Sequence, residues 1–176
     1  MALNKQTLTY KVVVSAVLIA LGVGLAPFIY IPFLTAKAYP GQHMINAIAG
    51  VLLGPLWAAF IATIIGIVRN ALGIGTIYAF PGGIPGGFVV GIFSYILKKV
   101  KPKIIEYAAL TEPIGTVIIG GTLSVYIVAP LIGDLKVSGA LIPIWFLFGI
   151  SSIPGSIIGF FILKVLKYVY KRTAFK

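Results

Sequence analysis

Six continuous apolar runs, separated by basic clusters or by glycine and proline, set the limits of what this chain can fold into. They occupy residues 10–28, 43–53, 56–72, 83–97, 111–132 and 141–165. The runs are continuous rather than alternating, which favours helices over strands. Charged residues make up only 10% of the chain, whereas about a quarter are charged in a soluble domain. We therefore expect an all-α polytopic membrane protein with six transmembrane helices, in which residues 1–176 form a single integral membrane domain.

Three of the six runs are short for a membrane span. A helix that crosses the hydrocarbon core needs about 20 apolar residues, and the runs at 43–53, 56–72 and 83–97 fall below that length. Such helices tilt little, thin the bilayer at their ends, or cross only part of it. The sequence leaves these three possibilities open.

The basic residues predict the orientation of the six spans. Only Lys37 and Lys136 fall in loops on one side, and Arg69 lies near the end of an apolar run. The other eleven of the fourteen lysines and arginines fall on the opposite side: Lys5, Lys11, Lys98, Lys99, Lys101, Lys103, Lys164, Lys167, Lys171, Arg172 and Lys176. Because basic loops stay in the cytoplasm, we expect both termini there and the protein in the cytoplasmic membrane. Anionic lipid headgroups, rather than nucleic acid, would then balance the net charge of +11.

Two of the three loops expected on the outside, at 29–42, 73–82 and 133–140, are unusual. Residues 29–42 are rich in proline, tyrosine and phenylalanine, which suits a lid or packed plug better than a solvated linker. Gly73 opens a glycine-rich stretch, GIGTIYAFPGGIPGG. Irregular backbone is tolerated at membrane depth only where it lines a cavity or is buried in protein. We therefore expect a ligand site at these loops.

The residue types exclude several enzyme classes. The sequence contains one histidine, no cysteine and three acids, Glu106, Glu112 and Asp134. These are too few ligands for a zinc or di-metal centre, no motif joins His43 to a Ser-His-Asp triad, and no phosphate-binding GxxxxGK[ST] loop occurs. We expect a protein without catalytic activity and without a cofactor in this chain. A small membrane enzyme acting on lipids is the weaker alternative, because metal-phosphate chemistry needs carboxylates, and a ligand-free channel or assembly subunit is another.

Polar side chains in the outer half of the spans form the candidate ligand site. A guanidinium such as that of Arg69 costs about 2.5–3.5 kcal/mol at the centre of a span on insertion scales, so it usually faces a protein interior or a cavity. The polar set offers hydrogen-bond donors, acceptors and aromatic faces, which suit a small heteroaromatic ligand. We expect ligand contacts from eight of these outer residues: His43, Asn46, Arg69, Asn70, Thr76, Tyr78, Tyr126 and Trp145. Glu112, at the expected cytoplasmic start of the fifth span, is a ninth candidate.

Several of these residues also have a structural interpretation. Trp145 and Tyr126 are typical of side chains that anchor helix ends at the headgroup level. His43 suits a helix cap or a bond to a loop carbonyl, and Arg69 is long enough to reach a lipid phosphate. The sequence does not choose between the two interpretations.

Glu112 and the small residues of the first run carry further alternatives. At the expected cytoplasmic start of the fifth span, Glu112 suits a first-turn acid favoured by the helix dipole, or it reaches inward to pair with a base or a ligand. Ser151 and Ser152 bond to the preceding helical turn or line the floor of the cavity. Ala16 and Ala20 lie four residues apart, a spacing that lets another helix approach closely.

Two stretches of the chain resemble the ThiW family. They are YPGQHMINAIAGVLLGPLWAA at residues 39–59 and RNALGIGTIYAFPGGIPGG at residues 69–87, with a weaker match, TEPIGTVIIGG, at 111–121. ThiW proteins are substrate-binding S components of energy-coupling factor (ECF) vitamin transporters, associated with the thiazole precursor of thiamine. The resemblance implies a six-helix S component with both termini cytoplasmic and a pocket that opens outward beneath the loops at 29–42 and 73–82.

The resemblance also implies partners, a ligand and a mechanism. The partners are a transmembrane coupling protein and two ATPase subunits, so ATP is hydrolysed outside this chain, and Ala16 and Ala20 match the pattern that packs against the coupling protein. The implied ligand is 4-methyl-5-(2-hydroxyethyl)thiazole, captured from outside before the whole S component tilts in the membrane. An S component for another heterocycle, such as a pyrimidine or another vitamin, is the alternative. Because this thiazole is neutral, Arg69 would organise the pocket through loop carbonyls, and Asn70, Asn46 and His43 would contact the ligand.

Overall fold

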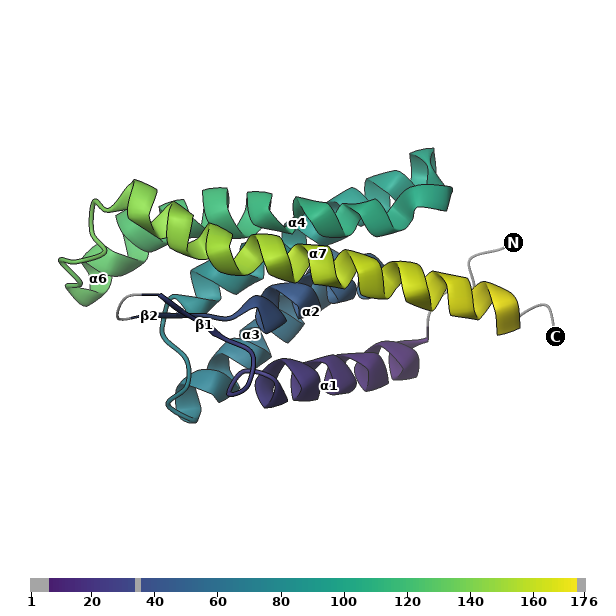
Figure 1. Ribbon diagram of the computed structural model, residues 1–176, viewed down its shortest axis with the longest axis horizontal. Helices are drawn as coiled ribbons and strands as arrows, with labels where there is room; N and C mark the ends of the chain where they lie inside the picture. The colour runs from purple at the N-terminus through teal and green to yellow at the C-terminus, as the bar shows by residue number, and fades with distance from the viewer. Residues whose placement is uncertain (1–6, 34–35, 174–176) are drawn as a thin grey trace.

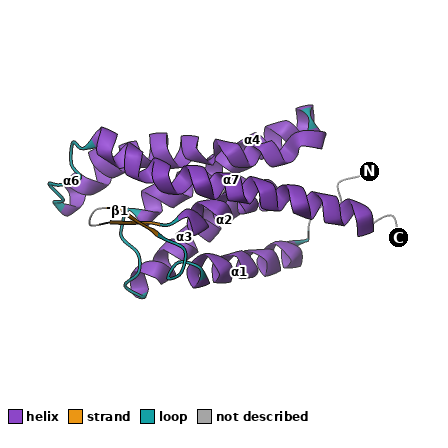
Figure 2. Ribbon diagram, in the orientation of Figure 1, coloured by secondary structure: helices purple, strands orange, loops and turns teal. Residues whose placement is uncertain are grey.

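The computed structural model describes residues 7–33 and 36–173, which are helical apart from one small hairpin (Figures 1 and 2). The main helices and the two strands are α1 Leu8–Gly24, β1 Ile31–Phe33, β2 Ala36–Ala38, α2 Pro40–Leu53, α3 Pro55–Ala71, α4 Ala79–Val100 and α7 Leu141–Thr173. Between α4 and α7 the helical segment changes its pitch, through the 3-10 helix η1 Pro102–Thr111, the π-helices η2 Ile114–Gly120 and η3 Ser124–Val128, and the short helices α5 Gly121–Leu123 and α6 Ala129–Ile132. The all-helical class is confirmed, and every apolar run forms a helix.

The helix α2 lies at the centre of the bundle, with α4 and α7 packed against it. All of its 14 residues except Met44 and Leu52 are buried. Glycines allow this close packing: a Cβ on Gly50 would come within 2.6 Å of Val90 Cγ1 in α4, and a Cβ on Gly159 of α7 within 2.8 Å of Ala47 Cβ. Small residues at helix contacts let backbones approach and gain van der Waals contact. The polar residues of α2 are thereby held inside the protein.

The glycine-rich stretch differs from its prediction as a loop. The helix α4 begins at Ala79, four residues before the predicted start at residue 83, so only the residues up to Tyr78 form the loop. Glycine and proline are loop signals in isolation, but Pro81 lies in the first turn of α4, where its missing N–H costs no helical hydrogen bond. Gly87 lies where a Cβ would be 3.1 Å from Ala58 Cβ. Close packing, and not chain reversal, explains these glycines.

The fifth helical segment begins at Pro102 and not at residue 111. The predicted fifth span left out the residues before 111, but in the structure they are helical and the Glu106 carboxylate pairs with Lys167 Nζ of α7 at 2.7 Å. That ion pair holds this part of the segment beside α7. Glu112 therefore lies well inside the helical segment, and its predicted place at a helix start is wrong.

Three of the connecting segments lie at one end of the bundle, opposite the start of α1 and the end of α7. The hairpin, in which Ile31 lies opposite Ala38, the loop after α3 and the loop after α6 share one end, whereas α1 begins and α4 and α7 end toward the other (Figure 1). The hairpin occupies most of the predicted lid at 29–42, of which residues 34–35 lie outside the described residues, as do Lys5 and Lys176 of the basic clusters. Ligand access and the basic clusters are thus separated along the molecule.

Three of the described helical segments are long and apolar enough to cross a bilayer. They are Ala79–Val100, Pro102–Ile132 and Leu141–Val169. The helices α1 and α3 are apolar but have 17 residues each, and α2 has 14. Six crossings and the side on which the termini lie stay predictions.

The turn between α2 and α3 stops short of the end of its neighbour α4. A Cβ on Gly91 of α4 would clash with the backbone of Gly54 and Pro55, so this turn lies level with Gly91. The end of α4 at Val100 lies nine positions after Gly91, which corresponds to about 14 Å of helix. Gly54 adopts φ +89°, a left-handed conformation that glycine tolerates. For α2 and α3 this geometry matches helices that reach only part of the way along the bundle, whereas the third short run, at 83–97, lies in α4, which is long enough to cross a bilayer.

Candidate ligand-binding cavity

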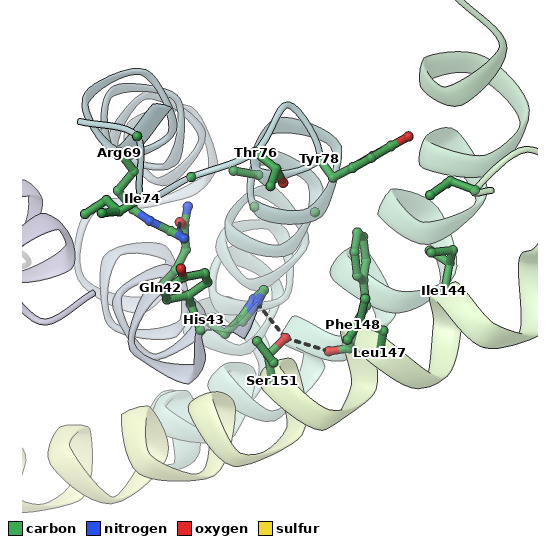
Figure 3. A pocket seen from close by; sticks show the side chains of 18 residues that line it. Gln42, His43, Arg69, Ile74, Thr76, Tyr78, Ile144, Leu147, Phe148 and Ser151 are labelled. Atoms are coloured by element: carbon green, nitrogen blue, oxygen red, sulfur yellow. Dashed lines mark hydrogen bonds between the residues drawn. The ribbon is translucent and has the colours of Figure 1, made fainter. Parts of the chain in front are cut away.

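A cavity of about 510 Å³ lies at the loop end of the bundle (Figure 3). Its walls come from the start of α2, the end of α3 with the following loop, the start of α4, Val137 and α7. The lining residues are Ala38, Tyr39, Gln42, His43, Arg69, Gly73, Ile74, Gly75, Thr76, Tyr78, Ala79, Gly82, Gly83, Val137, Ile144, Leu147, Phe148 and Ser151. Pockets for small molecules are mostly apolar, with a few placed polar groups, and measure about 300–1,000 Å³. The cavity fits that description.

His43 and Ser151 form the polar floor of the cavity. Ser151 Oγ lies 3.2 Å from His43 Nε2 and donates to the Phe148 carbonyl at 3.0 Å (Figure 3). On the other side of the ring, His43 Nδ1 lies 2.9 Å from Glu112 Oε1. A ring nitrogen that faces a carboxylate donates its hydrogen to it, which fixes the orientation of the imidazole. His43 therefore connects the cavity to the buried carboxylate behind it.

Glu112 is fully buried and is surrounded by hydrogen-bond donors. Besides His43, its Oε1 accepts from Asn46 Nδ2 at 3.1 Å and from Thr116 Oγ1 at 2.6 Å, and its Oε2 accepts from Ser152 Oγ. Four donors can hold a carboxylate in a water-free interior, where an unpaired charge would be very costly. Of the two roles considered for Glu112, the structure shows the inward one.

Two further contacts join this network to the glycine-rich start of α4. Asn46 Nδ2 also donates to the Gly83 carbonyl at 3.0 Å, and Thr116 Oγ1 lies 2.8 Å from the Gly82 carbonyl. A Cβ at Gly86 would overlap both Glu112 Oε1 and Thr116 Oγ1. Glycine at this position therefore makes the room that the carboxylate occupies.

Arg69 occupies the other polar end of the cavity and is only 3% exposed. Its guanidinium carbon lies 3.9 Å from the centroid of the Tyr39 ring, and its Nη1 donates to Gln42 Oε1. Cations over aromatic faces are attracted by the ring quadrupole. Within the described residues neither of these two contacts involves a loop carbonyl, so the predicted bonding of Arg69 to loop carbonyls stays a prediction.

Asn70, next in the chain, does not line the cavity. Its Nδ2 donates to the Gly66 carbonyl at 2.8 Å and to the Thr76 carbonyl at 3.0 Å. These two hydrogen bonds hold the loop after α3 against the end of that helix. The relative placement of the two neighbours is therefore the reverse of the prediction: Arg69 lines the cavity, and Asn70 organises the loop.

Tyr78 joins two loops at the rim of the cavity. Its hydroxyl donates to Oδ2 of Asp134, which lies in the loop after α6, at a distance of 2.7 Å. This bond holds the pKa of the Asp134 carboxyl below its usual value, and the backbone amides of Val137 and Lys136 add to the effect. Partial burial, followed by the bond to Asp134, raises the pKa of the Tyr78 phenol above its usual value. The hydroxyl is thus a donor over the whole physiological pH range.

The nine predicted ligand residues fall into three groups. His43, Arg69, Thr76 and Tyr78 line the cavity, whereas Asn46 and Glu112 lie behind its floor. Asn70, Tyr126 and Trp145 are not part of the lining: Tyr126 is 58% exposed, and Trp145 Nε1 lies 3.3 Å from Thr122 Oγ1.

Sequence reasoning missed three polar residues of the site, Tyr39, Gln42 and Thr116. Helical spacing could have found two of them. Gln42 precedes Asn46 by four residues and Thr116 follows Glu112 by four, so each shares a helix face with a residue already singled out. Tyr39 gives no such signal, because it precedes the first turn of α2.

The fold and the cavity together define a helical membrane protein with an internal cavity of a size that suits a small molecule. The chain belongs to the ThiW family: the family model, described as thiamine-precursor transporter protein (ThiW), matches residues 12–169. Among curated proteins and among solved structures, none matches the chain significantly. Family membership confirms the resemblance in the sequence and assigns the chain to the transport of thiamine precursors, which agrees with the expectation of a non-enzyme.

Proposed function

We propose that the protein is the substrate-capture subunit of an ECF-type importer in the cytoplasmic membrane and binds the thiazole precursor of thiamine, 4-methyl-5-(2-hydroxyethyl)thiazole, from the outside. The observation that carries the proposal is the cavity of about 510 Å³ at the loop end of the bundle. Its apolar wall, with Ile74, Leu147 and Phe148, suits a methylated aromatic ring, and its floor, with His43 and Ser151, suits a hydroxyl group.

The distribution of basic residues along the bundle supports capture from the outside. The basic clusters lie on α4, η1 and α7, toward the end opposite the cavity, where Lys167 Nζ bonds Glu106. With those clusters in the cytoplasm, the cavity opens to the outer face. Six crossings and cytoplasmic termini are part of this proposal.

The partners we propose are a transmembrane coupling protein and two ATPase subunits, which hydrolyse ATP because this chain has no nucleotide-binding loop of its own. The helix α1 lies at the edge of the bundle (Figure 1). Its residues Ala16 and Ala20 are exposed, together with Val13 and Val17. A small-residue stripe flanked by apolar side chains suits contact with another membrane helix.

Ligand binding by the purified chain tests the proposal directly. Calorimetry in detergent should detect binding of hydroxyethylthiazole, and mass spectrometry of the freshly purified protein should detect the compound carried along. Thiamine, a methylated aminopyrimidine and other vitamins serve as competitors. Tight binding of a pyrimidine without thiazole binding would favour an S component for another heterocycle, and turnover of a lipid substrate would favour an enzyme. No binding of any thiazole, pyrimidine or thiamine would refute the proposal.

A further inference from the structure

Arg69 brings a positive charge to the cavity that no acid of this chain balances. The sequence contains only three acids, and each one is committed elsewhere. Glu106 pairs with Lys167 and Glu112 with His43, while Asp134 accepts from the Tyr78 hydroxyl. A buried charge without a partner is costly, and more so within a membrane protein. The charge of Arg69 is thus available to something outside the chain.

The neighbour of Arg69 adds a second unused donor. An arginine side chain only donates hydrogen bonds, so Gln42 must present its Oε1 to Arg69 Nη1, as it does. This fixes the amide so that Gln42 Nε2 points away, and Nε2 has no hydrogen-bond partner among the described residues. Arg69 Nε has none either. Both side chains are more than nine-tenths buried and line the cavity.

These groups form an end of the cavity that offers donors and positive charge only. The centroid of the Tyr39 ring lies 3.9 Å from the guanidinium carbon, and attraction to an aromatic face is worth about 0.5–2 kcal/mol. The polar floor formed by His43 and Ser151 is a separate polar part of the cavity, and the apolar residues Ile74 and Phe148 also line the cavity (Figure 3). A neutral hydroxyethylthiazole can satisfy the floor and the apolar wall, but it brings no negative charge to Arg69.

We propose that the preferred ligand is a thiazole that carries an oxyanion, a carboxylate or a phosphate monoester, and that Arg69 and Gln42 bind this group. The inference rests on the proposed function and specifies its ligand further. Guanidinium groups bind carboxylates and phosphates through paired, charge-assisted hydrogen bonds. Glu112 does not contact the cavity, because it lies behind His43, and four hydrogen-bond donors of the chain face its two oxygens.

Calorimetry with three related compounds tests this inference on the purified full chain. The compounds are 4-methyl-5-(2-hydroxyethyl)thiazole, its phosphate monoester and its 2-carboxylate. We expect one of the two oxyanion compounds to bind about tenfold to hundredfold more tightly than the neutral one, the range that a charge-assisted hydrogen bond supplies. Whether the carboxylate or the phosphate gains more identifies the group.

Substitutions then assign the preference to Arg69. In Arg69→Gln the ratio between the affinities for the oxyanion and the neutral compound should fall close to one, and in Arg69→Lys it should fall only partly. The control Lys136→Gln removes the same charge from an exposed position outside the cavity lining and should keep the wild-type ratio.

The possible outcomes separate this inference from the proposed function. Neutral thiazole binding at least as tightly as both oxyanion compounds to the wild-type protein would overturn the inference alone, whatever the folding of the variants. An unchanged ratio in folded Arg69→Gln would also overturn it. Failure of all three compounds to bind would remove the proposed function and the inference together.

Discussion

Glu112 is a carboxylate in the interior of a helical bundle, where burial is tolerated only because other side chains donate hydrogen bonds to it. His43, Asn46, Thr116 and Ser152 all point hydrogen-bonding groups at its two oxygens. Replacing the carboxylate with an amide leaves some of these donors without an acceptor. A buried donor without a hydrogen-bond partner has lost its bonds to water without compensation, which lowers the stability of the fold. The network is therefore expected to respond as a unit.

Glu112→Gln tests the network at constant side-chain shape. We expect a loss of about 2–4 kcal/mol in the free energy of unfolding, because buried donors are left without an acceptor, and a lower ligand affinity because His43 loses its orienting partner. The matched control is Glu106→Gln. Its partner Lys167 has a side chain 30% exposed and can turn to water when the ion pair is lost, so this loss should be smaller than that of Glu112→Gln. Thermal unfolding in detergent measures both, and equal losses would contradict the prediction.

The sequence predicted the residue types of the site better than their roles. His43, Arg69, Thr76 and Tyr78 were singled out and line the cavity, because polar groups in apolar runs are rare enough to stand out. The exchange of roles between Arg69 and Asn70 was not predictable. Adjacent residues on a helix point about 100° apart, and only the packing of α3 against α2 decides which of the two faces inward.

The loops after α3 and α6 are joined by one side-chain bond, from Tyr78 to Asp134. Because the Asp134 pKa is lowered in the folded protein, its contribution to stability is present above the unfolded value of about 3.9 and is lost as pH falls through the folded value. Because the Tyr78 pKa is raised, its contribution is present below the unfolded value of about 10 and is lost as pH rises through the folded value. The bond should thus be fully effective from about pH 5 to 9.

Tyr78→Phe tests this loop contact. We expect a small fall in melting temperature that is constant between about pH 5 and 9 and shrinks toward both extremes, together with a faster release of bound ligand, since the two loops are no longer joined at the rim. Tyr168→Phe makes the same chemical change at a side chain that is 65% exposed and should have no effect. A Tyr78→Phe difference that grows steadily with acid would contradict the assigned direction.

The exposed face of α1 is the element on which partner assembly is expected to depend. Ala16→Trp or Ala20→Trp should reduce co-purification with the coupling protein about tenfold or more, equivalent to about 1.4 kcal/mol, because a large ring prevents close helix approach. Ligand binding should be retained, since neither residue lines the cavity. Ile158→Trp on α7, another exposed apolar position, is the control. Loss of ligand binding in the α1 variants would instead indicate a damaged fold.

The helices themselves were predictable and their boundaries were not. Long apolar runs gave every main helix, since a chain at membrane depth must satisfy its backbone internally. Two boundaries moved because tertiary contacts override local signals. The glycines of α4 make room for Ala58 and Glu112, and the Glu106–Lys167 ion pair extends the helical segment back to Pro102.

The two ends of the whole molecule differ in both charge and shape. The cavity and its loops lie at one end, and the basic clusters of α4, η1 and α7 toward the other (Figure 1). Lys101 and Lys136 flank the helical segment Pro102–Ile132, whose 31 residues exceed the roughly 20 needed to cross the hydrocarbon core. If the basic end is cytoplasmic, these two lysines lie on opposite sides of the membrane.

Single cysteines make this orientation measurable, because the natural chain contains none. A membrane-impermeant maleimide should label Lys136→Cys and Phe28→Cys in intact cells, and Lys101→Cys only after permeabilisation. All three positions are exposed, so differences in labelling report the side of the membrane and not burial. Labelling of Lys101→Cys in intact cells, without labelling of Lys136→Cys, would invert the molecule and place the cavity on the cytoplasmic face. An importer that captures its substrate outside would then be excluded, whatever the affinity of the cavity for thiazoles.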